Sequence, residues 1–145
     1  MKISKQALLS FLDAAIIISG CGNMQAVFSE QAYQQAVSLK VESLDVVSKA
    51  TEEYSTHQTE ITRLQSELQK AYQYALGRPN NDTTTRQWEI LLDPERNLLG
   101  GFLARWEQKG SMSQVFIDEN KRIISDAFDT IIELESGKRK PSDVE

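Results

Sequence analysis

Apolar side chains recur at helical spacing between Met24 and Leu76, a stretch that contains neither glycine nor proline. In its second half, the recurring positions are separated alternately by three and four residues, which gives a stripe with a period of 3.5 residues. These seam positions are Val47, Ala50, Tyr54, His57, Ile61, Leu64, Leu68, Ala71 and Ala75. The pattern is typical of a coiled-coil or bundle helix, and Gly77 and Pro79 predict its end.

The upstream part of this stretch has a wider apolar spacing, so a change of register is expected near Leu44. At about 1.5 Å per residue, one helix of roughly 50 residues would be about 75 to 80 Å long. The pattern favours a continuous or merely bent helix. Any break is expected in the hydroxyl-rich patch at residues 55–59, where Ser55 and Gln58 suit a capping box.

The middle of the chain is less regular. Residues 78–85 have the composition of a loop, and a short helix holding Trp88 is expected to follow it. Asp93-Pro94 is a favourable helix start, and Gly100-Gly101 is interpreted as a break or turn. A further short apolar face includes Trp106.

The last helix has its apolar residues on one side, between Phe116 and Leu134. Ser111 or Ser113 is expected to cap its start, and Gly137 its end. The predicted fold is therefore all-α, with a long N-terminal helix bearing a coiled-coil-like seam, short irregular helices and an antiparallel C-terminal helix. This gives an elongated hairpin or small bundle over residues 24–136, followed by a polar tail at 137–145.

Two arrangements of the long helix remain open. A C-terminal helix of about 24 residues reaches only about 36 Å, so it would leave part of a continuous seam uncovered. Ile61, Leu64 and Leu68 would then be candidates for binding a protein partner or a second copy of the chain. A bend near Ser55 would instead close the rod into a monomeric bundle. Trp88 and Trp106 are interpreted as core residues, with partner binding as the alternative.

The first residues have the organisation of an export signal. Lys2 and Lys5 precede an apolar run at residues 7–18, which Asp13 interrupts, and the small residues Ser19 and Gly20 lead directly to Cys21. An uncleaved anchor is the alternative. However, about 12 apolar residues are too few to span about 30 Å of hydrocarbon, which takes about 20.

Ile18-Ser19-Gly20-Cys21 resembles the lipobox of bacterial lipoproteins. The resemblance implies cleavage between Gly20 and Cys21, a diacylglycerol on the Cys21 sulfur and an acylated new amino terminus. Residues 1–20 would be the signal peptide and 21–23 the lipidated N-terminus, in the cell envelope, facing the periplasm or the exterior. Gly22-Asn23 lacks the aspartate that resembles an inner-membrane retention signal, so the outer membrane is expected if the host has two membranes.

Composition narrows the function further. The chain has 145 residues, with 16 basic and 21 acidic side chains, and removal of Lys2, Lys5 and Asp13 with the signal peptide leaves 14 against 20. A net acidic surface repels phosphate backbones, which disfavours nucleic-acid binding. Cys21 is the only cysteine, and its lipidation would explain an otherwise free thiol in an exported protein.

Candidate chemistry is sparse. His57 is the only histidine, so a metal site would need carboxylates alone around it. The sequence also shows no convincing set of nucleophile, base and orienting residue for a catalytic triad. We therefore expect no enzyme activity and no cofactor apart from the covalent lipid. The favoured function is a non-catalytic helical interaction or structural module of the envelope. The alternatives are a small envelope enzyme or accessory factor, and a lipoprotein of the exclusion or immunity type.

Overall fold

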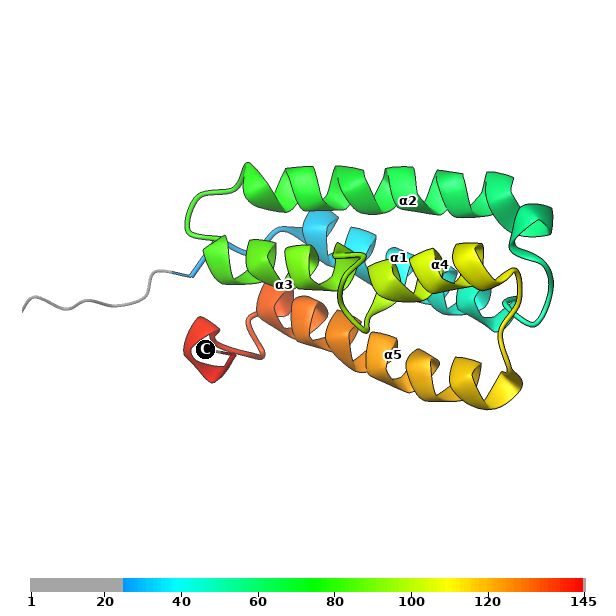
Figure 1. The fold of residues 1–145 in the computed structure, drawn as a ribbon. Helices are drawn as coiled ribbons and strands as arrows, with labels where there is room; N and C mark the ends of the chain where they lie inside the picture. Colours follow the sequence, from blue (N-terminus) through cyan, green and yellow to red (C-terminus); the bar gives the residue numbers. More distant parts are fainter. Residues whose placement is uncertain (1–24, 145) are drawn as a thin grey trace, which may run out of the picture.

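The computed structural model describes residues 25–144, which form five α-helices (Figure 1). The predicted all-α fold is confirmed, because helices account for 75% of this part of the chain and it contains no strand. Gly20 and Cys21, with the whole signal-peptide prediction, lie outside the described residues. Within 25–144, no helix combines the length and the apolar character needed to cross a bilayer.

The stretch expected to be one long helix is divided in two. Helix α1 spans Glu30–Ser48 and helix α2 spans Tyr54–Leu76, and the two run antiparallel (Figure 1). Ser29 caps α1 by accepting a hydrogen bond from the Ala32 amide at 3.2 Å. The favoured prediction of a continuous or merely bent helix is therefore wrong, and the break lies just before the hydroxyl-rich patch, at residues 49–53.

Distant residues hold the chain in this turn. The Tyr54 amide donates to the Gly110 carbonyl, and the Met112 amide donates to the Ala50 carbonyl, both at 2.7 Å. The indole nitrogen of Trp106 donates to the Glu52 carbonyl at 2.9 Å. These bonds satisfy backbone groups that a continuous helix would have paired internally, so the turn forms without glycine or proline.

The remaining helices complete a four-helix bundle. Helix α3 (Asp82–Leu92) and helix α4 (Leu99–Lys109) lie end to end and together take the place of the third helix of the bundle (Figure 1). Helix α5 (Gln114–Ser136) is the fourth and runs back in the opposite direction (Figure 1). The predicted boundaries of α5 are confirmed. The Ser113 hydroxyl accepts from the Phe116 amide, and Gly137 ends the helix in the left-handed conformation, with φ of 74°.

Gly100 and Gly101 do not break a helix as expected, because both lie in the first turn of α4. Their role is to let two stretches of backbone approach closely. A methyl group on Gly101 would lie 1.7 Å from the Arg96 carbonyl oxygen, and one on Gly100 would lie 2.2 Å from the Leu92 carbonyl oxygen. The pair therefore allows the tight connection between α3 and α4.

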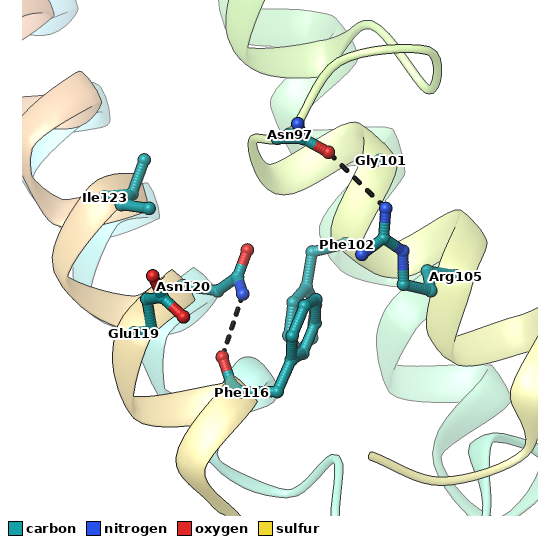
Figure 2. A pocket seen from close by; sticks show the side chains of 8 residues that line it. All are labelled: Asn97, Gly101, Phe102, Arg105, Phe116, Glu119, Asn120 and Ile123. Carbon is teal, nitrogen blue, oxygen red and sulfur yellow. Dashed lines mark hydrogen bonds between the residues drawn. The ribbon is translucent and has the colours of Figure 1, made fainter. Parts of the chain in front are cut away.

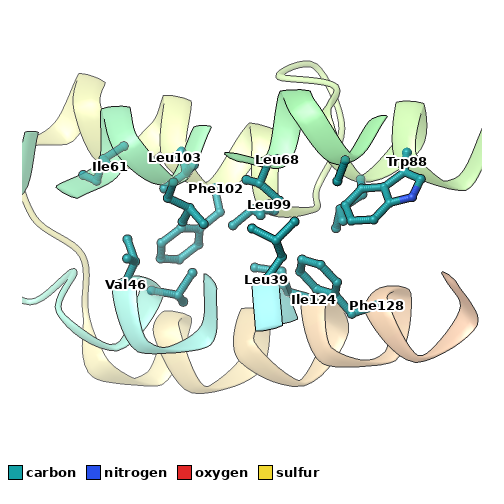
Figure 3. Packing of buried hydrophobic residues seen from close by; sticks show 14 of the residues in the cluster. Leu39, Val46, Ile61, Leu68, Trp88, Leu99, Phe102, Leu103, Ile124 and Phe128 are labelled. Atoms are coloured by element: carbon teal, nitrogen blue, oxygen red, sulfur yellow. The ribbon is translucent and has the colours of Figure 1, made fainter. Parts of the chain in front are cut away.

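One apolar core runs the length of the bundle and takes side chains from all five helices (Figure 3). All five candidates for partner binding are part of it: Ile61, Leu64, Leu68, Trp88 and Trp106. The favoured interpretation of the two tryptophans as core residues is confirmed. Because the five side chains pack against helices of the same chain, they are not available to a partner in this fold. The seam that a rod would expose is closed by α1, α3 and α4, and the two tryptophans fill the core.

Candidate functional site

A groove separates α4 from the first half of α5. It has a volume of about 300 Å³ and its walls come from both helices and from the loop before α4 (Figure 2). The lining residues are Asn97, Gly101, Phe102, Arg105, Phe116, Glu119, Asn120 and Ile123. The groove combines apolar, amide and charged groups in a small space.

The half-buried Phe116 ring forms much of its apolar surface and packs on Phe102, which is buried in the core. Phe102 of α4 and Phe116 of α5 are stacked, with centroids 5.9 Å apart and an interplanar angle of 13°. The Arg105 guanidinium lies 5.2 Å from the centroid of the Phe116 ring, within the range of a cation–π interaction. These contacts hold the side chains of Phe102, Phe116 and Arg105 in place relative to one another.

Polar groups stand on both sides of these rings. Arg105 donates a long hydrogen bond of 3.4 Å to the side-chain oxygen of Asn97 and makes no ion pair with any residue in 25–144. The Asn120 amide nitrogen donates to the Phe116 carbonyl at 2.8 Å, and Figure 2 shows its oxygen turned away from Phe116. The groove therefore offers a cation and an amide acceptor beside an aromatic surface.

A second hollow of about 360 Å³ continues the first toward the loop between α4 and α5. Arg105 and Phe116 line both, and Lys109, Ser111, Met112 and Ser113 complete the second. We call the two together the α4–α5 groove. It opens at the half of the bundle opposite to the end where residue 25 lies (Figure 1).

His57 lies near this end but serves a different purpose. One ring nitrogen is 2.9 Å from a Glu52 carboxylate oxygen, and the other is 3.6 Å from one of Glu60. Its ring centroid is 5.7 Å from that of Trp106. The histidine therefore fastens the turn between α1 and α2 to the core.

Lys49 extends this group of charges. Its ammonium group contacts Asp45 at 2.8 Å and Glu60 at 2.7 Å, and hydrogen bonds to these two carboxylates raise the pKa of Lys49. The nearby Tyr54 is partly buried, which raises the pKa of its hydroxyl. Across residues 25–144, histidine and carboxylate side chains do not gather in any group of three or more suited to a metal ion.

Comparisons of the chain with protein-family models, curated proteins and solved structures found no match. None of the five partner-contact residues predicted from sequence lines the α4–α5 groove. The groove residues Arg105 and Asn120 were not singled out in the sequence.

One signal in the sequence does point to the groove. Ile117, Ile124 and Phe128 form the buried stripe of α5, and Asn120 occupies the position between the first two. An amide at a core position of a helix requires a polar partner or an opening nearby. Here it has both, since it bonds to the backbone of its own helix and borders the groove.

Proposed function

We propose that this chain is a lipid-anchored, non-catalytic interaction module of a bacterial cell envelope. The observation that carries the proposal is Ile18-Ser19-Gly20-Cys21 behind a positively charged and apolar leader. Each buried methylene of an acyl chain contributes about 0.8 kcal/mol, so two or three chains on Cys21 would anchor the protein stably. In a host with two membranes, Gly22-Asn23 favours the outer one.

The α4–α5 groove is the proposed partner-binding site. The lining residues of α5 lie in its first half, whereas Gln25 bonds to Leu134 near the end of this helix of about 35 Å, so the groove lies in the half of the bundle remote from the proposed anchor. Arg105 and Lys109 supply positive charge, Glu119 adds one carboxylate, and the half-buried Phe116 ring, packed against the buried Phe102, supplies apolar surface. This chemistry suits a protein segment that carries a carboxylate next to an apolar or aromatic side chain.

The surroundings of the single histidine support a non-catalytic role. Glu52 and Glu60 face its two ring nitrogens, and Trp106 packs against its ring. A nucleophilic mechanism would need a hydroxyl or thiol within hydrogen-bond reach of this ring. Within the described residues, the hydrogen-bonding partner of the His57 side chain is a carboxylate instead.

Replacing Cys21 with serine tests the anchor. We expect Cys21→Ser to accumulate as uncleaved precursor without acylation, because a hydroxyl cannot form the thioether that lipidation requires. Metabolic labelling with a tagged fatty acid and a gel-mobility assay would measure both effects. Asn23→Ser is the matched control and should be processed normally. Equal acylation of the Cys21→Ser protein and the wild type would contradict the proposal.

Replacing Arg105 with alanine tests the groove. A photo-crosslinking amino acid at Lys109, on the groove rim, should capture a discrete envelope protein in living cells. We expect Arg105→Ala to lower the yield of that product about tenfold, as loss of a desolvated arginine anchor typically does. Arg86 of α3 is also exposed and makes no ion pair within 25–144, so Arg86→Ala is the control. Equal yields from the two variants would place partner binding elsewhere.

A further inference from the structure

Three segments meet at one end of the bundle, which we call the basal end: residues 25–28 before α1, the last residue of α2 with residues 77–81 after it, and residues 137–144 after α5 (Figure 1). Specific bonds join them. Gln25 donates to the Leu134 carbonyl at 3.0 Å, and Arg78 donates to the Val27 carbonyl at 2.6 Å. Arg78 also pairs with the buried carboxylate of Glu135. These bonds fix the three segments of the basal end relative to one another.

Exposed apolar side chains gather on this surface. Val27 is 88% exposed, Phe28 59% and Leu76 53%. The other large hydrophobic side chains with high exposure, Val41 and Val115, lie on the sides of the bundle or at its far end. Three large apolar groups in water at one end of a small domain indicate a contact surface.

Some charged side chains of the basal end form ion pairs within the chain and others do not. Lys138 and Lys140 are exposed and form no ion pair with any residue of the described chain. Several of the acidic groups nearby already have partners: Glu133 with Arg139, Glu135 with Arg78, and Asp143 with the Lys140 amide. Glu30 and Asp82 lie in the first turns of α1 and α3, where the helix dipole favours negative charge. The basal end thus has two lysines without an ion-pair partner, beside the carboxylates of Glu30, Asp82 and Asp143, which form no ion pair within the described residues either.

The short connection to Cys21 decides what covers this surface. Four residue steps separate Cys21 from Gln25, and a fully extended chain spans at most about 3.6 Å per step, or about 14 Å. With acyl chains on Cys21 inserted in a membrane, Gln25 therefore stays within about 14 Å of the lipid-bearing residue, and the basal end is held close to the bilayer surface. This step rests on the proposed lipid anchor.

We infer that the basal end of the bundle lies on the bilayer surface. Val27, Phe28 and Leu76 enter the interface, and Lys138 and Lys140 face anionic headgroups. The bundle then stands away from the membrane, with the α4–α5 groove at the far half and open to partners in the envelope space. The lipid thus fixes the orientation of the protein as well as its location.

Fluorescence quenching from within the bilayer tests this orientation. The lipidated protein, its acylation first verified by mass, is reconstituted in vesicles of phosphatidylethanolamine with a minority of phosphatidylglycerol. Because lipid occupies the only native cysteine, Ser142→Cys at the basal end and Ser111→Cys at the far end each provide a single labelling site. Headgroup-attached quenchers should quench the label at 142 severalfold more strongly than the label at 111.

A matched pair of valine substitutions separates surface contact from tethering alone. We expect Val27→Asp to reduce quenching at 142 severalfold, and Val41→Asp on the side of α1 to leave it unchanged. Equal quenching at 142 and 111, or equal effects of the two aspartates, would overturn the inference. Self-association of the basal ends in place of quenching would also overturn it. A mass without acyl chains would instead refute the proposed anchor, before any quenching is measured.

Discussion

Aspartate at position 61 should unfold the domain. The Ile61 side chain is 0% exposed and belongs to the core shared by α1, α2 and α4. Placing an unpaired carboxylate there costs about 3 to 5 kcal/mol, in addition to the lost apolar contacts. Because small domains are stable by only about 5 to 15 kcal/mol, Ile61→Asp should remove most of the folding free energy.

Urea denaturation followed by circular dichroism measures this loss, and Ser66→Asp on the exposed face of α2 is the control. We expect the control to stay within about 0.5 kcal/mol of the wild type. Sedimentation of the unlipidated domain should show a monomer, because the seam is covered within one chain. The rod with an exposed seam would instead be supported if the wild type formed an oligomer and the Ile61→Asp protein were a folded monomer.

Alanine at Gly101 should destabilise the protein, although helix propensity alone predicts a gain of about 1 kcal/mol in a helix. The new methyl group would lie 1.7 Å from the Arg96 carbonyl oxygen, so the connection between α3 and α4 would have to move. Overpacking of this kind typically costs about 1 to 3 kcal/mol and occasionally more. Thermal and urea denaturation would measure the net loss.

Gly77→Ala is the matched control for this effect. Gly77 has a φ of −76°, and an added methyl group would meet its nearest neighbour at an ordinary distance of 3.5 Å. Alanine there should stabilise the domain by about 0.4 to 1 kcal/mol, because it restricts the unfolded chain. A stabilising effect at both glycines would show that the close backbone approach at Gly101 is not present in solution.

Local signals in the sequence were sufficient to predict the helical class and the last helix. The apolar stripe of α5, the cap at Ser113 and the terminator at Gly137 all act within a few residues of the structure that they specify. The same holds for the end of α2 before Gly77. Such features are predictable because their physics involves near neighbours along the chain.

The turn at residues 49–53 was not predictable in this way. Its backbone groups bond to Gly110 and Met112, and its carbonyl at Glu52 accepts from Trp106, more than 50 residues away in the chain. Local composition favoured helix, and tertiary hydrogen bonds decided otherwise. The helix break expected at Gly100-Gly101 is absent for a similar reason. These glycines are needed because two stretches of backbone lie close together there, and not because the chain turns.

The candidate site was not predictable from the sequence either, because it also depends on tertiary packing. Seam residues such as Leu64 are candidates for partner binding only if the long helix is continuous, whereas the closed bundle buries them. The α4–α5 groove depends on the path of two helices that the sequence does not place relative to one another. Asn120, an amide within an apolar stripe, was the available clue.

The proposed location of the protein and the proposed orientation of its bundle both depend on the lipid anchor at Cys21. Intact-mass measurement of the protein purified from its native membrane tests it most directly. We predict a mature chain that begins at Cys21 and carries a diacylglycerol thioether and an acylated amino terminus. A chain that retains residues 1–20, or that begins elsewhere with an unmodified Cys21, would show that the protein has no lipid anchor at this cysteine.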